Sequence, residues 1–290
     1  MNKPKRPRYK PLPTTTVLSL GAGVQSSTMA LMASKGEYGI PKPDFAVFAD
    51  TQAEPQSVYD HLEWLIPQLD FEVIIDTNGN LRDDILAPNR YGSDFIEIPV
   101  YVEKVNGRKG ITRRQCTSNY KIRVIEKVIR DRVVKSVGRK TFSTHTPIIQ
   151  QIGISTDEAH RMRDNRHCAI TNAYPLIDAG FSRSDCLQWF NQHYPNKILP
   201  RSACTFCPFH NNAEWKNLLI NEPEAFEDAV FIDEQIRNKG NFDTGHYSYL
   251  HQSLKPLGEL RDYFLAVEDK PDDESRNNNF GEECEGVCGV

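Results

Sequence analysis

The chain has 290 residues, of which 39% are hydrophobic and 26% charged, and its net charge is −4 from 35 basic and 39 acidic side chains. This composition is typical of a folded globular protein and excludes a general nucleic-acid coat or a fully disordered chain. No apolar run is long enough to predict a transmembrane helix, and the basic N-terminus lacks the apolar stretch of a signal peptide. We therefore expect a cytoplasmic protein with no membrane partner.

Charged residues are distributed unevenly. Residues 1–14 are basic and rich in proline, which predicts a disordered arm, and residues 266–290 are acidic, which predicts a flexible tail. Between residues 104 and 140 there are thirteen basic residues and only two acids, Glu126 and Asp131. Such a run is compatible with a solvated face or with a site for a polyanion.

Strands and helices are predicted to alternate along the first half of the chain. The apolar patterns predict strands at residues 15–20, 45–48, 71–75 and 148–154, and helices at 26–32, 57–66 and 121–135. This alternation predicts an α/β fold, with a parallel twisted sheet covered by helices on both faces, over residues 15–169. After residue 170 the prolines increase, and residues 170–265 are expected to form a helical, cysteine-bearing portion that completes the site.

Three segments follow predicted strands and are expected to share the ligand-binding edge of the sheet: residues 21–23, 50–51 and 155–156. The first is a Gly-rich turn before a helix, where backbone N–H groups and the helix dipole favour an anion. It lacks the Gly-Lys-Ser/Thr ending of a Walker loop, and Ser26 stands where a dinucleotide fingerprint has glycine. A plain serine-capped strand–turn–helix is the alternative interpretation.

The run Gly21-Ala22-Gly23-Val24-Gln25-Ser26 resembles the PP-loop of the adenine nucleotide alpha-hydrolase-like superfamily. Gln25 stands where ATP-cleaving members usually carry Asp, so the run looks more like the PAPS reductase branch, whose loop holds a sulfonucleotide. The resemblance implies a Rossmann-like fold and an adenosine nucleotide as ligand. The loop residues that it implies for nucleotide binding are Ser19, Gly21, Gly23, Gln25, Ser26 and Ser27.

Three further segments resemble the same family, in the same order. Residues 48–54 resemble its strand-end Asp-Thr-Gly segment, which places Asp50 and Thr51 near the adenosine. Residues 153–161 resemble the segment that ends in an arginine beside the phosphates or sulfate, and Arg114-Gln115-Cys116 with Lys121 resembles the run of cluster-bearing members. From these segments the resemblance adds Arg114, Gly153, Asp157 and Glu158 as nucleotide-binding residues, and Arg161 and Lys121 as catalytic residues.

The seven cysteines are an odd number, which disfavours a disulfide framework in a reducing compartment and indicates metal or redox chemistry. Cys204 and Cys207 form a C-x-x-C pair in which both sulfurs can bind one metal centre. The resemblance adds Cys116, so these three cysteines are the expected ligands of a four-iron four-sulfur cluster, with one iron open as in ATP-dependent thiolases of the superfamily.

Several alternatives at the cysteines stay open. The fourth ligand of the cluster could be Cys168, Cys284 or Cys288. A zinc site would add His210, three residues after Cys207, to the same three cysteines. The cysteines could also carry no metal, and Cys186, within an apolar helical run, is expected in the core.

The acidic tail contains Cys284 and Cys288, and sulfonucleotide reductases carry their nucleophilic cysteine in a Glu-Cys-Gly context near the C-terminus. The resemblance therefore implies a PAPS or APS reductase that uses one of these thiolates and a thioredoxin-type reductant. Two alternatives remain. One is an ATP-dependent PP-loop sulfurtransferase that thiolates a nucleic acid or a small acceptor. The other is a non-catalytic nucleotide-binding or zinc-stabilised module.

Overall fold

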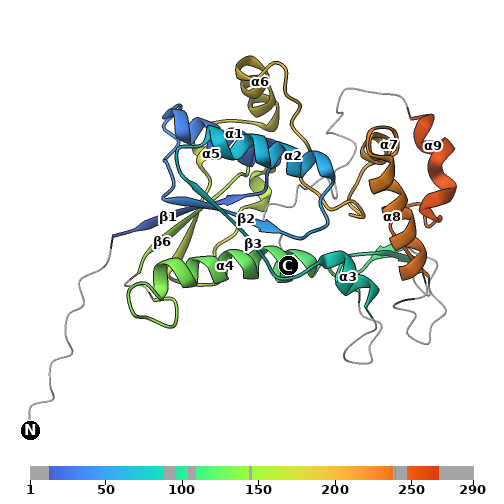
Figure 1. The fold of residues 1–290 in the computed structure, drawn as a ribbon, viewed down its shortest axis with the longest axis horizontal. Coiled ribbons are helices and arrows are strands. Elements are labelled where there is room, and N and C mark those ends of the chain that lie inside the picture. Colours follow the sequence, from blue (N-terminus) through green and yellow to red (C-terminus); the bar gives the residue numbers. More distant parts are fainter. Residues whose placement is uncertain are drawn as a thin grey trace, which may run out of the picture.

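The computed structural model describes residues 13–87, 96–103, 109–143, 146–237, 239 and 247–267. Within them, five parallel strands form one sheet in the order β3-β2-β1-β6-β7 (Figure 1). The strands are β1 (Thr15–Leu20), β2 (Phe45–Asp50), β3 (Glu72–Thr77), β6 (Ile148–Ile152) and β7 (Ile170–Ala173). The chain adds strands on one side of β1 and then crosses to the other, which places a switch point between β1 and β6.

Both faces of the sheet are covered by helices. Val17 and Leu18 of β1 point to opposite faces because strand side chains alternate, and both are fully buried. Leu18 packs with α1 (Val24–Lys35), α2 (Gln56–Leu65) and α6 (Arg183–His193), whereas Val17 packs with α4 (Arg123–Ile129). Figure 1 shows α1 and α2 on one side of the sheet and α4 on the other. The predicted doubly covered parallel sheet is confirmed.

The predicted elements differ from the observed ones mainly at their ends. The long helix expected at residues 121–135 is α4 flanked by two π-helical stretches, Thr117–Ile122 and Arg130–Val134. The sheet also continues past residue 169, because Ile170–Ala173 forms the edge strand β7. Two further helices follow it, α5 (Pro175–Asp178) and α6, and both lie against α1.

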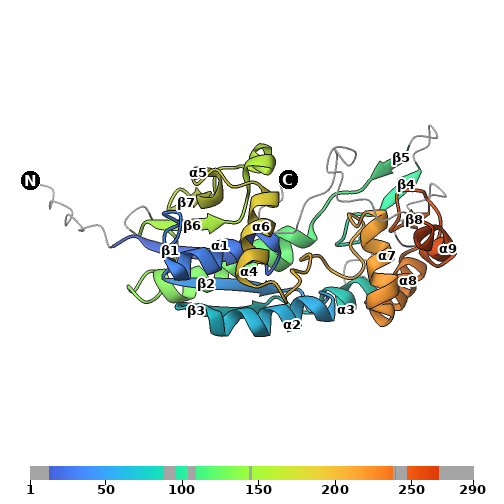
Figure 2. The same cartoon turned by 90° about the horizontal axis from the view of Figure 1, so that it is seen from above.

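The remaining described residues form a second apolar core beside the sheet (Figure 2). It contains α3 (Leu81–Leu86), α7 (Asn212–Asn221), α8 (Pro223–Ile236) and α9 (Arg261–Leu265). A small antiparallel sheet, β5 (Lys109–Ile111), β4 (Tyr101–Glu103) and β8 (Ser248–Tyr249), lies next to these helices. Asp233 of α8 is buried and accepts the backbone N–H groups of Leu250 and Leu257, which fixes the chain between β8 and α9.

Candidate functional site

The carboxyl ends of β2, β1 and β6 are neighbours in the sheet, so the segments that follow them lie along one edge. These are residues 51–54 after β2, residues 21–23 after β1 and residues 153–161 after β6. The edge includes the switch point between β1 and β6, where open parallel sheets bind their ligands. The structure thus brings together three of the segments that the sequence identified as nucleotide-binding.

The turn between β1 and α1 leaves the helix N-terminus without a side-chain cap. Gly23 is the N-cap residue with extended backbone, and the first turn of α1 is buried. The left-handed residue of the turn is Ala22, with φ of 57°, rather than either glycine. The Ser26 hydroxyl accepts the backbone N–H of Gly21 at 3.2 Å, which closes the turn. An uncapped helix N-terminus favours an anion through its N–H groups and its dipole.

Gln25 connects the turn after β1 to the segment after β6. Its side chain is fully buried, and its Nε2 atom donates to Ser155 Oγ at 3.3 Å and to Glu158 Oε2 at 3.1 Å. Its Oε1 atom accepts from Arg183 Nη1 at 3.5 Å. Arg161, which is 4% exposed, forms an ion pair with Glu158 at 2.7 Å. Arg183 was not identified from the sequence, although it begins α6 directly after the capping residue Ser182.

Two predicted nucleotide-binding hydroxyls hydrogen-bond to neighbouring protein side chains. Ser19 Oγ accepts from Gln150 Nε2 at 2.7 Å, and Ser27 Oγ lies 2.9 Å from Nε2 of His61, with all four side chains buried. Burial, with a smaller contribution from Lys197, lowers the pKa of His61 to about 4. His61 is therefore neutral near pH 7, and one hydrogen bond forms between its Nε2 atom and the hydroxyl of Ser27.

The segment after β2 starts with a fixed carboxylate. Asp50 Oδ1 accepts the Tyr59 hydroxyl and the Gln52 N–H, each at 2.8 Å. Burial and this bond to Asp50 raise the pKa of Tyr59 above its usual value, so Tyr59 stays protonated and donates. Gln52 has a left-handed backbone with φ of 57°, which turns the chain sharply after Thr51.

The three cysteines predicted as metal ligands pack into the same apolar core. Cys204 is buried, and Cys116 and Cys207 lie against the same cluster of side chains, although Cys116 is 88 positions before Cys204. Cys204 Sγ lies 3.4 Å from Thr51 Oγ1, and the Cys207 N–H donates to the carbonyl of Cys204 at 2.9 Å. Cysteine thiolates are the ligands that usually hold iron–sulfur clusters in proteins.

The thiol donors are not arranged around a metal position. Among the residues that the structure describes, no group of three or more His, Cys, Asp or Glu side chains has the spacing to hold a metal ion. His210, the extra ligand of the zinc alternative, uses Nε2 to bond the Cys204 carbonyl at 2.9 Å, and its Nδ1 faces Glu214 at 3.6 Å. Burial lowers the pKa of His210 to about 3, so it is a neutral imidazole that donates to the loop backbone.

Lys121 and Glu54 form a buried ion pair between the segment after β2 and the helix after Cys116. The Lys121 Nζ atom lies 3.2 Å from Glu54 Oε1, and the two side chains are 7% and 1% exposed. Arg114 lies over the ring of Phe209 at 4.9 Å, two residues after Cys207. Lys121 and Arg114 are therefore placed beside the cysteine-bearing segments. Glu54 is a site residue that the sequence analysis did not identify.

The basic run at residues 104–140 forms several ion pairs where it is described. Lys127 pairs with Asp76 at 2.6 Å, and Arg132 makes two hydrogen bonds to the carboxylate of Glu72. Lys135 pairs with Asp131 at 2.6 Å. These exposed pairs support the solvated-face interpretation for this part of the run.

The other cysteines fall into separate environments. Cys186 is fully buried among α1 and α6 side chains, as expected, and Cys168 is exposed. Cys284 and Cys288, the predicted nucleophiles, lie outside the described residues.

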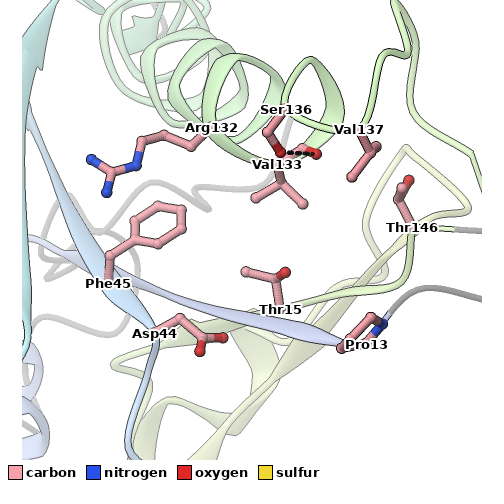
Figure 3. Close-up of a pocket in the computed structure, with 9 residues that line it drawn as sticks. All are labelled: Pro13, Thr15, Asp44, Phe45, Arg132, Val133, Ser136, Val137 and Thr146. Carbon is pink, nitrogen blue, oxygen red and sulfur yellow. Dashed lines mark hydrogen bonds between the residues drawn. The ribbon is translucent and has the colours of Figure 1, made fainter.

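A pocket of about 330 Å³ lies at the other ends of the strands, between the starts of β1 and β2 and the π-helical stretch Arg130–Val134 that follows α4 (Figure 3). Its lining includes Phe45, Val133 and Thr146, and none of the predicted site residues borders it. The pocket is therefore separate from the switch-point edge.

No family model matches this sequence, and no curated protein matches it as a relative. In the described part of the chain, no helix has both the length and the apolar character needed to cross a membrane.

Proposed function

We propose that the protein is an enzyme that binds an adenosine nucleotide at the switch-point edge and carries out thiol-dependent sulfur chemistry of the PAPS reductase type. One observation carries the proposal. The segment after β2 lies at the same edge of the sheet as the Gly-rich turn and residues 153–161. The same segment contacts the loop of Cys204, through Thr51 and Cys204. The proposed nucleotide site would thus be adjacent to the loop of Cys204.

The anionic part of the nucleotide is assigned to the N-terminus of α1. Its uncapped backbone N–H groups stabilise negative charge, and Gln25 holds residues 155 and 158 beside it. Arg161 adds positive charge from the same segment, next to Glu158. The adenosine is assigned to the neighbouring end of β2, where Asp50 lies.

In the proposed reaction, the thiolate of Cys288 or Cys284 attacks the sulfur of the sulfonucleotide. A sulfur–sulfur bond forms while the bond between the sulfur and the phosphate oxygen breaks, and AMP or its 3′-phosphate leaves with the electron pair. A thioredoxin-type dithiol then attacks the cysteine sulfur, releases sulfite and is itself oxidised to a disulfide. The positive groups at the edge stabilise the departing phosphate. Cysteines used in this way fit the reducing cytoplasm.

The thiol donors of Cys116, Cys204 and Cys207 suit an iron–sulfur cluster better than zinc. The zinc alternative needs His210 as a ligand, and the Nε2 atom of His210 is already bonded to the Cys204 carbonyl. To hold the cluster, the three thiols would have to move closer together than they lie in the described structure, and the side chains of the apolar core would exclude water from it. A cluster bound there would supply electrostatic stabilisation and a source of sulfur. Lys121 and Glu54 orient the segments on either side.

The three-cysteine set also favours a second candidate, an ATP-dependent sulfurtransferase. In that reaction ATP adenylates an acceptor, such as a nucleic-acid base or a small molecule, with release of pyrophosphate, and sulfide then displaces AMP from the adenylated acceptor. The buried amide of Gln25 argues against it, because the position offers no carboxylate for the magnesium ion of ATP.

Nucleotide titration with product analysis tests the proposal. The full chain is mixed with PAPS, APS or ATP with magnesium, and thermal stabilisation is measured alongside sulfite, AMP and pyrophosphate. The reductase proposal predicts stabilisation by a sulfonucleotide and thiol-dependent release of sulfite, which replacement of Cys284 and Cys288 by Ser abolishes. Stabilisation by ATP alone, with pyrophosphate release, would favour the sulfurtransferase, and binding without turnover would indicate a non-catalytic module.

A further inference from the structure

Residues 51–54 contact both cysteine-bearing segments. Thr51 Oγ1 lies 3.4 Å from Cys204 Sγ, and the carbonyl of Ala53 accepts the N–H of Thr205 at 2.8 Å. At the other end of the segment, Glu54 pairs with Lys121, which lies five positions after Cys116. Three residues of the segment after β2, Thr51, Ala53 and Glu54, therefore contact the cysteine-bearing segments.

We propose that Thr51 is a positioning residue for Cys204, and that residues 51–54 transmit nucleotide occupancy at the sheet edge to this cysteine. The second half of the statement rests on the proposed nucleotide site, whereas the first half does not. Thr51 is 1% exposed and Cys204 is 8% exposed, so their contact is shielded from water. A hydrogen bond in such surroundings fixes the sulfur more firmly than an exposed one would.

The hydroxyl of Thr51 has little freedom to move. Threonine is β-branched and restricted in χ1, and the Thr51 carbonyl accepts the N–H of Leu81 at 3.0 Å. The left-handed Gln52 then redirects the chain toward Ala53 and its bond to Thr205. The backbone on both sides of Thr51 is thus held, and the hydroxyl is presented to the sulfur in one position.

The link to the nucleotide comes from Asp50, the residue before Thr51. Its carboxylate is held by Tyr59 and by the Gln52 N–H at the end of β2. A ligand seated on this strand end restrains the segment that follows. The loop of Cys204 then opens less often, since Thr51 and Ala53 are bonded to it, and the Cys204 thiol becomes less accessible to reagents.

Alkylation of individual cysteines by N-ethylmaleimide, followed by mass spectrometry, tests both halves on the full chain after chelator treatment has removed any iron, so that no cluster covers the Cys204 sulfur. Without nucleotide, Thr51→Val removes the hydroxyl with little change of shape and is expected to speed alkylation of Cys204 about fivefold, the equivalent of one hydrogen bond of about 1 kcal/mol. Thr51→Ser keeps the hydroxyl and should react like the wild type. Exposed Cys168 gives the reference rate, and fully buried Cys186 reports any loss of the fold.

The nucleotide arm uses AMP as the probe, with its binding measured separately by equilibrium dialysis. AMP is expected to slow alkylation of Cys204 in the wild type and in Thr51→Ser, and to slow it less in Thr51→Val, which keeps only the bond between Ala53 and Thr205. Wild-type rates in Thr51→Val, or equally fast rates in Thr51→Ser, would overturn the positioning role. Equal protection by bound AMP in Thr51→Val would overturn the coupling. Absence of AMP binding would reject the nucleotide site and the coupling together, while the nucleotide-free rates still decide the role of Thr51.

Discussion

The side-chain nitrogen of Gln25 lies 3.1 Å from a carboxylate oxygen of Glu158, across the switch point of the sheet. The two residues are 133 positions apart, and each belongs to a segment that follows one of two adjacent strands. The same amide also donates to Ser155. Gln25 therefore fixes the distance between the two walls of the proposed nucleotide site.

Replacing Gln25 with Leu tests this relationship. The substitution keeps the volume but removes one buried hydrogen-bond donor to Glu158 and to Ser155, so the free energy of unfolding is expected to fall by about 1–3 kcal/mol. Nucleotide affinity should fall as well, because the segment after β6 loses its tie to α1. Urea unfolding and equilibrium dialysis measure the two effects.

Gln56→Leu is the matched control, since Gln56 is exposed at the start of α2 and bonds only to the exposed Asp60 among the contacts described. Its effect on stability should stay within about 0.5 kcal/mol. If Gln25→Leu were as stable as this control and bound nucleotide normally, the bridging role of Gln25 would be wrong.

The fold could be predicted because its signals are local. The run of apolar residues in β1 buries Val17 on one face and Leu18 on the other, as a strand covered on both sides requires. The Gly-rich turn and the helix after it were also readable, although the left-handed conformation falls on Ala22. The edge strand β7 was missed because Ile170–Ala173 is short and followed by prolines.

The contacts that define the candidate site could not be predicted from one sequence. Thr51 and Cys204 are 153 positions apart, and Glu54 and Lys121 are 67 apart, so no spacing rule connects them. The resemblance indicated that Thr51 belongs near the adenosine, whereas the structure shows its hydroxyl beside a cysteine. Pairings of this kind depend on how the sheet and the second core meet.

The cysteine core gives a second prediction. We expect each single replacement by Ser, at Cys116, Cys204 or Cys207, to remove most of the iron and acid-labile sulfide from anaerobically purified protein. Each of these thiols is a proposed ligand. Cys186→Ala is the control and should retain both, since Cys186 packs with α1 and α6 in a different core. A stoichiometric zinc content without sulfide in the wild type would reject the cluster.

A third prediction concerns the buried ion pair. Lys121→Met leaves Glu54 as a buried charge without its cation, so the free energy of unfolding is expected to fall by about 3–5 kcal/mol. Lys127→Met breaks the more exposed pair with Asp76 and should cost no more than about 1 kcal/mol. Chemical denaturation of both variants makes the comparison, and equal losses would show that burial of the Lys121 pair adds nothing.

The fourth prediction follows from the histidine that contacts Ser27. Burial lowers the folded-state pKa of His61 to about 4 from its ordinary value of 6.5. Between these two values the unfolded chain binds the proton and the folded chain does not, so stability is fully present above pH 6.5 and falls as the pH drops toward 4. At pH 5 the loss attributable to His61 is about 2 kcal/mol, from 1.36 kcal/mol per pH unit.

His61→Gln removes the titrating group and keeps a polar atom near Ser27, so its stability should change less between pH 7.5 and pH 5 than that of the wild type. His251, whose pKa burial also lowers to about 4, titrates in both proteins and cancels in the comparison. Urea unfolding at the two pH values measures the difference, and identical slopes for His61→Gln and the wild type would show that His61 is protonated in the folded protein as easily as in the unfolded chain.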